Sequence, residues 1–274
     1  MKNNKIISFI LILILIIGIC LLLYPTISNY WNSFHQSKAI QQYETAVEQL
    51  DEETCNRMLE EAEEYNRNKK AQSHFELTES EKKLYNSLLN ISGDGVMGYL
   101  EIPVIGVKLP ICHSSSEIVL QSSIGHLEWT SLPVGGDSTH SVLTGHRGLP
   151  SSRLLTDLDR IALGDRFKIK VLNQVLTYEV DLIRIVEPSD IKDLKIVENE
   201  DYCTLMTCTP YGINTHRLLV RGTRVFDVSD IDISADAMPV EPMMVAPIVF
   251  IMLVLIILLL YGVIHSIKKR ILLK

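Results

Sequence analysis

The chain of 274 residues lacks an excess of positive charge, and its central part has no run of like charge that would suggest a polyanion as partner. Its formal net charge is −7. Nucleic-acid binding calls for a basic surface, so nucleic acid is excluded as a partner.

None of the five cysteines forms a C-x-x-C pair, which excludes a zinc ribbon and a thioredoxin-like motif. No cluster of metal-ligand residues stands out, and we expect no metal and no cofactor.

The cysteines are Cys20, which lies in an apolar run, and Cys55, Cys112, Cys203 and Cys208. Four cysteines outside that run permit disulfides in an oxidising compartment. Pairing of Cys55, Cys112 and Cys203 stays open. Cys203 and Cys208 are five residues apart on one expected strand, so they should face opposite sides and not pair. At least one thiol is therefore expected to be free.

Two long apolar runs are present, one near each end of the sequence. The first extends from Ile6 to Tyr24 and the second from about Met243 to Ile264. A span needs roughly 20 apolar residues to cross a bilayer, and both runs are long enough. A cleavable signal peptide is the alternative for the first run, but the residues from Pro25 to Ser28 offer no small-x-small cleavage site. We expect an uncleaved anchor.

Basic residues flank both runs on their outer sides. Lys2 and Lys5 precede the first, and four basic residues follow the second within residues 266–274. Basic ends prefer the cytoplasm. We therefore expect a cell-membrane protein with two transmembrane helices, both termini cytoplasmic and the middle extracytoplasmic. The expected order is a cytoplasmic N-terminus (1–5), anchor (6–25), helical spacer with a lid (26–92), β domain (93–226), acidic linker (227–242), second span (243–265) and basic tail (266–274).

Helical patterning precedes the β domain. Residues 30–70 favour helix, with a break at Asp51-Glu52-Glu53, and residues 79–89 resume the pattern. Most of this region is interpreted as a solvated spacer, and residues 152–161 as a helical turn.

Short segments rich in β-branched and aromatic residues follow, separated by turn residues. The expected strands are 97–102, 107–112, 141–144, 167–172, 175–185, 202–207 and 216–221, with Asn173-Gln174 as a tight hairpin. This pattern suggests a closed barrel or a sandwich. Strict βαβ alternation is absent, so a Rossmann-like sheet is not expected.

Cys208 ends one of these strands, and Pro210-Tyr211-Gly212 forces a turn directly after it. The next strand begins near His216 and brings Arg217 within reach of the thiol. A cation beside a thiol favours the thiolate and can stabilise an oxyanion. The alternative is a buried structural cysteine, with Arg217 in a surface salt bridge.

A nucleophilic cysteine needs a base or an imidazolium partner. His146 follows another expected strand and has glycines on both sides, as expected where backbone bends tightly around a site. Four other histidines of the central region compete for this role: His113, His126, His140 and His216.

Thr204-Leu-Met-Thr-Cys208 resembles the TLxTC signature of sortases, Arg217 occupies the position of their catalytic arginine, and Thr144-Gly-His146 matches the segment around their catalytic histidine. Four further stretches resemble the pilin-polymerising subgroup, class C: Gly95-Val-Met-Gly-Tyr-Leu-Glu-Ile-Pro103, Gly125-His-Leu-Glu128, Ser131-Leu-Pro-Val-Gly-Gly136 and Thr207-Cys-Thr-Pro-Tyr-Gly-Ile-Asn-Thr-His-Arg217. The resemblance extends from about Gly93 to Arg224.

This resemblance implies a mainly β fold, an eight-stranded sortase-type barrel with N-terminal helices and two flanking transmembrane helices. It implies a cysteine transpeptidase that cleaves an LPxTG-like signal of pilin precursors between Thr and Gly and passes the thioacyl group to a pilin lysine. Cys208 would be the nucleophile, His146 the general acid/base and Arg217 the oxyanion or substrate stabiliser. Thr207 is assigned to substrate binding.

Class C sortases usually carry a lid with an Asp-Pro-aromatic motif. The corresponding segment here is Ser73-His74-Phe75, which has no aspartate to pair with Arg217. We expect a lid resting on Phe75 that closes more weakly than in relatives. The alternative is a linker without a covering role.

Three other readings of the whole chain stay open. A hydrolytic cysteine peptidase would use the same dyad, and a sortase attaching proteins to cell-wall peptidoglycan would use the same site. A non-enzymatic membrane-anchored scaffold would not need Cys208.

Overall fold

The computed structural model describes residues 2–69, 77–226 and residue 254. The expected acidic linker (227–242), second span (243–265, residue 254 excepted), basic tail (266–274) and lid residues Ser73, His74 and Phe75 lie outside the described residues. These expectations stay predictions.

Three helices precede the strands: α1 (Lys2–Glu48), α2 (Glu52–Lys69) and α3 (Glu79–Ser87). Within the part of α1 from Ile10 onward, an 18-residue window has a mean hydropathy of 2.9 and no buried residue. By length and composition this helix is able to cross a membrane. The break between α1 and α2 falls at the expected acidic residues, where Asp51 accepts a hydrogen bond from the Thr54 backbone at 2.7 Å.

The expectation of a largely solvated spacer is wrong for α2 and for the second half of α1. The described residues from Trp31 to Phe226 belong to one compact unit, and Ile40 and Tyr43 of α1 are buried there. Helix α2 buries Cys55, Leu59 and Ala62 in the main hydrophobic core. Each of these helices is mostly polar and has only a narrow apolar stripe, which packs against the β domain. The sequence pattern alone therefore suggests a solvated helix.

Helix α3 begins with a capping box, in which Thr78 and Glu81 bond reciprocally through side chain and backbone. It buries Tyr85, whose hydroxyl lies 3.0 Å from His126 Nδ1.

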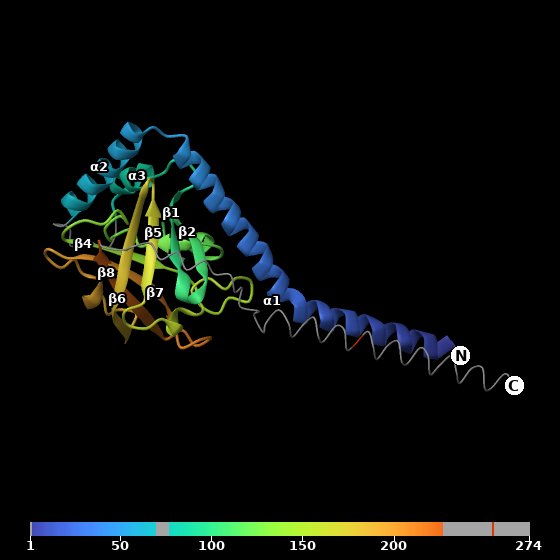
Figure 1. Cartoon of the computed structure of the whole chain (residues 1–274). Helices are drawn as coiled ribbons and strands as arrows, with labels where there is room; N and C mark the ends of the chain where they lie inside the picture. Colours follow the sequence, from blue (N-terminus) through green and yellow to red (C-terminus); the bar gives the residue numbers. More distant parts are fainter. Residues whose placement is uncertain (1, 70–76, 227–253, 255–274) are drawn as a thin grey trace. The chain divides into compact units, whose positions relative to one another are not determined.

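Eight strands close into a barrel in the order β1-β2-β3-β4-β7-β8-β6-β5. Most of these strands are labelled in Figure 1. The pairs β2–β3 and β4–β7 are parallel and the others are antiparallel. The strands are β1 (Val96–Ile102), β2 (Val107–Cys112), β3 (Ile124–His126), β4 (Thr139–Thr144), β5 (Arg166–Val171), β6 (Gln174–Val186), β7 (Asp201–Thr209) and β8 (His216–Val225). The eight-stranded barrel is confirmed.

Two local expectations need correction. The β5–β6 turn is centred on Leu172 and Asn173, because Val171 pairs with Gln174. Leu172 takes a positive φ of 52°, the conformation that tight hairpins require. Of the helical turn expected over 152–161, only the 3-10 helix η2 (Leu158–Arg160) forms.

Alternation along β7 defines two faces of the barrel wall. Cys203 and Leu205 point into the main core, whereas Met206 packs into a separate cluster around Val142, Leu194 and Leu219. Because side chains alternate along a strand, Cys208 shares the outer face with Met206. This confirms that Cys203 and Cys208 face opposite sides, and both are free thiols.

Candidate active site

Cys208 and Arg217 are directly paired across β7 and β8. Directly opposite residues of an antiparallel pair project from the same face, with Cβ atoms about 5 Å apart. The thiol and the guanidinium therefore share the outer face of the barrel. Cys208 is half-buried, and the Arg217 guanidinium donates to the carbonyl oxygens of Asn214 and His216 at 3.4 and 3.2 Å.

The parallel pairing of β4 with β7 brings His146 beside this pair. Thr144 pairs with Met206, and the Gly145 N–H donates to the Met206 carbonyl at 3.1 Å. Continuing the register places His146 alongside Cys208, where neighbouring strands are about 4.8 Å apart. The three backbones that carry the predicted thiol, imidazole and guanidinium thus meet at one end of three adjacent strands.

The Thr207 side chain points to the opposite face of β7 from Cys208. It is 1% exposed, and its hydroxyl donates to the Gly145 carbonyl at 2.7 Å. This bond fixes the strand end before His146 against the strand end that carries Cys208. Its assignment to substrate binding stays a prediction.

The four competing histidines have other surroundings. His126 is fully buried between Tyr85 and the Ser131 carbonyl, and burial lowers its pKa to about 3. His140 lies between the Lys195 carbonyl and the Thr204 hydroxyl, and burial lowers its pKa to about 4. His113 bonds to the Leu88 and Gly95 carbonyls, and His216 to the neighbouring Thr215. His146, whose side chain is 26% exposed, is the histidine beside Cys208.

Two further residues shape this end of the barrel. The Arg147 guanidinium donates to Asp159 at 2.5 Å and to the Thr209 hydroxyl at 3.3 Å. Glu117 Oε1 lies 3.3 Å from His146 Nε2. The sequence analysis predicts neither residue. The only sequence signal for Arg147 is its position directly after His146, and no sequence pattern indicates Glu117.

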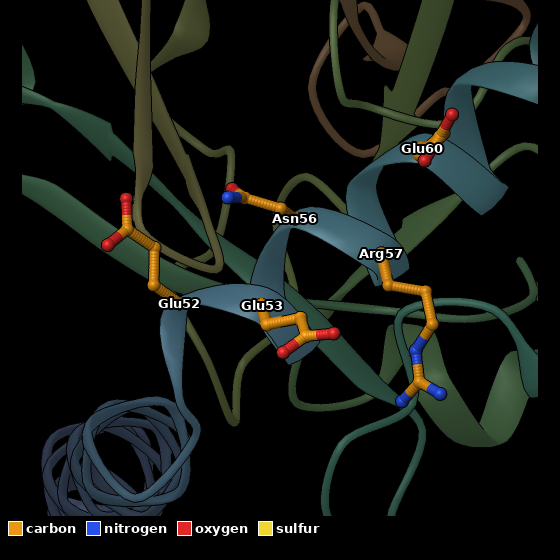
Figure 2. A pocket seen from close by; sticks show the side chains of 5 residues that line it. All are labelled: Glu52, Glu53, Asn56, Arg57 and Glu60. Carbon is orange, nitrogen blue, oxygen red and sulfur yellow. The ribbon is translucent and has the colours of Figure 1, made fainter.

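An open hollow elsewhere on the surface lies along α2, lined by Glu52, Glu53, Asn56, Arg57 and Glu60 (Figure 2). No thiol and no imidazole is among the residues that line it. Among the described residues, no group of three or more His, Cys, Asp or Glu side chains is arranged to hold a metal ion.

Comparison with known proteins agrees with this geometry. Residues 100–225 match the sortase domain. Sortase C1 from Streptococcus agalactiae is 53% identical and superposes with a TM-score of 0.67, covering 70% of this chain and 100% of that one. The chain belongs to the sortase family. Sortases are cysteine transpeptidases, and the family assignment made from the TLxTC-like segment is confirmed.

Two other sortases show how far the likeness extends. Sortase C from Streptococcus pneumoniae is 40% identical, with a TM-score of 0.63 over 71% of this chain and 100% of that chain. Sortase D from Bacillus subtilis (strain 168) is 28% identical over 131 residues, which are 47% of this chain and 63% of that relative. The sortase described here therefore spans less than two thirds of that curated relative, but all of each of the two sortase C chains.

Proposed function

We propose that this sortase is a membrane-anchored transpeptidase that polymerises pilins outside the cytoplasm. It cleaves an LPxTG-like sorting signal between Thr and Gly and joins the Thr carbonyl to a lysine amine of a pilin. The observation that carries the proposal is the direct pairing of Cys208 with Arg217 on the outer face, with His146 on the adjacent strand end.

The reaction follows from this arrangement. The Cys208 thiolate attacks the Thr carbonyl carbon, and the Arg217 guanidinium stabilises the oxyanion that develops. The His146 imidazolium gives its proton to the leaving Gly amine as the C–N bond breaks. An incoming lysine amine attacks the thioacyl carbon, returns a proton to His146 and releases the thiolate.

The outer face also suits the substrate. The cluster around Val142, Leu194 and Leu219 lies on the same face of β4, β7 and β8 as Cys208, with partly buried Trp129 and Met206 at its border. Apolar surface beside the nucleophile favours the Leu and Pro of the signal and limits water, which competes with the amine for the thioacyl bond.

Anchoring and pilin substrates have separate support. The apolar helix α1 is able to hold the enzyme at the membrane, where a membrane-held precursor would be presented. Among structural relatives, the Streptococcus pneumoniae sortase C acts on pilin substrates, and another sortase C1 belongs to a pilus island. The second span at 243–265 belongs to the same proposal, because its basic flank favours the cytoplasmic side.

The test compares the full chain with Cys208→Ala in cells that express a pilin and no other sortase. Wild type should give a ladder of high-mass pilin polymers on denaturing gels, and Cys208→Ala should give monomer only. Polymers that persist in Cys208→Ala would refute the assignment. Release of cleaved monomer, with no polymer even when lysine acceptor is in excess, would instead indicate a hydrolytic peptidase. Monomer attached to peptidoglycan would indicate a cell-wall anchoring sortase.

A further inference from the structure

Glu117 is the carboxylate that contacts His146. It opens the short helix α4 (Glu117–Leu120), and its Oε1 atom lies 3.3 Å from His146 Nε2. Gln121 donates to the same oxygen at 2.7 Å. An ionised carboxylate accepts hydrogen bonds and donates none, so the His146 ring must donate from Nε2.

The packing of α4 against β3 keeps Glu117 close to His146. Helix α4 lies against Gly125 of β3, where a Cβ atom would be 2.5 Å from the Ser114 carbonyl oxygen and 3.0 Å from Leu120 Cδ2. Gly125 in turn pairs with Thr144, two residues before His146. The close approach that glycine permits therefore places α4 over the strand end from which His146 projects.

A second contact fixes the segment after α4. Gln36 of α1 donates to the Ser122 carbonyl at 2.8 Å. The carboxylate thus stands on a segment held from two sides, although its own side chain is 68% exposed.

We propose that Glu117 is a positioning residue of the sortase reaction, which keeps the proton of His146 on Nε2 and leaves Nδ1 to exchange protons with the substrate. The inference rests on the proposed function. In the acylation step, Nδ1–H of the imidazolium protonates the leaving amine while Nε2–H stays bonded to Glu117. In the second step, the neutral ring takes the proton of the attacking amine at Nδ1, and the thiolate leaves. The ring never has to turn over between the two steps.

The two arginines near His146 are bonded to other groups and do not fix its ring. Arg147, the next residue along the chain, is directed to Asp159 and Thr209, and Arg217 donates to carbonyls of its own turn. Because Glu117 is exposed, its effect on the rate is modest and arises from orientation rather than from a strong buried charge pair.

The tautomer of His146 is the direct test. The full chain in detergent, with 15N-labelled histidine and signals assigned by comparison with His146→Gln, should show the Nε2–H tautomer of the neutral ring once a pH titration of the signals reaches its upper plateau. Glu117→Gln keeps an oxygen acceptor and should retain that tautomer. Glu117→Ala should shift the ring towards a mixture of tautomers. An Nδ1–H ring in the wild type, or an unchanged tautomer in Glu117→Ala, would overturn the proposal.

Kinetics supply the second measurement. In Glu117→Ala, kcat for transpeptidation of an LPxTG peptide to an amine should fall about 2- to 5-fold, the range of an exposed charge pair. KM should change less than about twofold, since orientation acts on the chemical step. A wild-type kcat in Glu117→Ala would contradict the inference.

Glu179→Gln is the matched control. Glu179 is an exposed, ion-paired glutamate that lies opposite Thr223, six residues along β8 from Arg217. That separation is about 20 Å along a strand, so this variant should keep the wild-type kcat and tautomer. If transpeptidation survives Cys208→Ala, the proposed function falls, whereas the tautomer measurement still decides whether Glu117 directs the His146 ring.

Discussion

The ion pair between Arg147 and Asp159 joins the segment that carries the imidazole to the 3-10 helix η2. Arg147 follows His146, and its side chain is only 9% exposed, whereas that of Asp159 is 50% exposed. The guanidinium also donates to Thr209, the residue after Cys208. We predict that removing the carboxylate destabilises the sortase more than replacing the arginine with an apolar side chain of similar length.

The magnitude follows from the unequal burial. Asp159→Ala leaves a buried guanidinium without its counter-ion, and breaking a fully buried pair costs about 3–5 kcal/mol. The partner is half-exposed and water can reach the vacated site, so we expect about 2 kcal/mol, within the range for a hydrogen bond to a charged group. Arg147→Met keeps the apolar stem in place and leaves a carboxylate that water solvates, so we expect less than about 1 kcal/mol.

Urea unfolding of the full chain in detergent measures both changes through the transition midpoint at constant m value. Glu179→Ala, which breaks the exposed Arg166–Glu179 pair, is the surface control and should cost less than about 0.5 kcal/mol. The double variant Arg147→Met/Asp159→Ala should resemble Arg147→Met alone, because no stranded charge remains. If Arg147→Met costs as much as Asp159→Ala, the reasoning from unequal burial is refuted.

Three further predictions concern contacts around the barrel. Gly125→Ala places a methyl group against the Ser114 carbonyl and should cost about 1–3 kcal/mol in urea unfolding; a neutral effect would show that α4 moves away freely. Asn66→Ala removes both bonds that buried Asn66 makes to the Leu132 backbone and should cost about 2–4 kcal/mol, whereas Asn56→Ala on the exposed face of α2 should cost under about 0.5 kcal/mol; equal costs would contradict the docking of α2. Burial lowers the pKa of His140 to about 4 in the folded state, against about 6.5 when unfolded. The unfolded chain binds the proton first, so stability should fall as pH drops from about 6.5 to 4. His140→Gln should make that fall shallower, and an identical pH dependence would refute the assignment.

Seven of the eight strands could be predicted from the sequence, because turn residues bound each β-rich segment. The strand β3 (Ile124–His126) was missed: three residues are too few for an alternation pattern to show. The packing of α2 was also missed, although Cys55, Leu59, Ala62 and Asn66 recur at helical spacing and are all buried. Because these residues include a thiol, a small side chain and an amide, they do not form an obvious apolar stripe in the sequence. Their burial becomes evident only from the packing of α2 against the barrel.

In the candidate site, too, some residues could be predicted from the sequence and others could not. Cys208 and Arg217 lie on consecutive strands joined by the short loop 210–215, so their proximity is local and the sequence predicts it. The approach of His146 depends on the parallel pairing of β4 with β7, which joins residues about 60 positions apart. The place of His146 after an expected strand and its flanking glycines made it a candidate, and the family resemblance added the match to a catalytic histidine. Glu117 acts through a contact across 29 positions, and an exposed glutamate at the start of a short helix carries no distinguishing pattern.

Closure of the barrel restricts how a peptide is recognised. Each of the eight described strands already has a hydrogen-bonded neighbour on both sides, so no free backbone edge is available to take up an extended sorting peptide as an additional strand. The peptide must instead be read by side chains on the outer surface and by the connecting loops. Sequence preference should therefore be transferable between sortases by exchanging loops, with the hydrogen-bonded scaffold left unaltered.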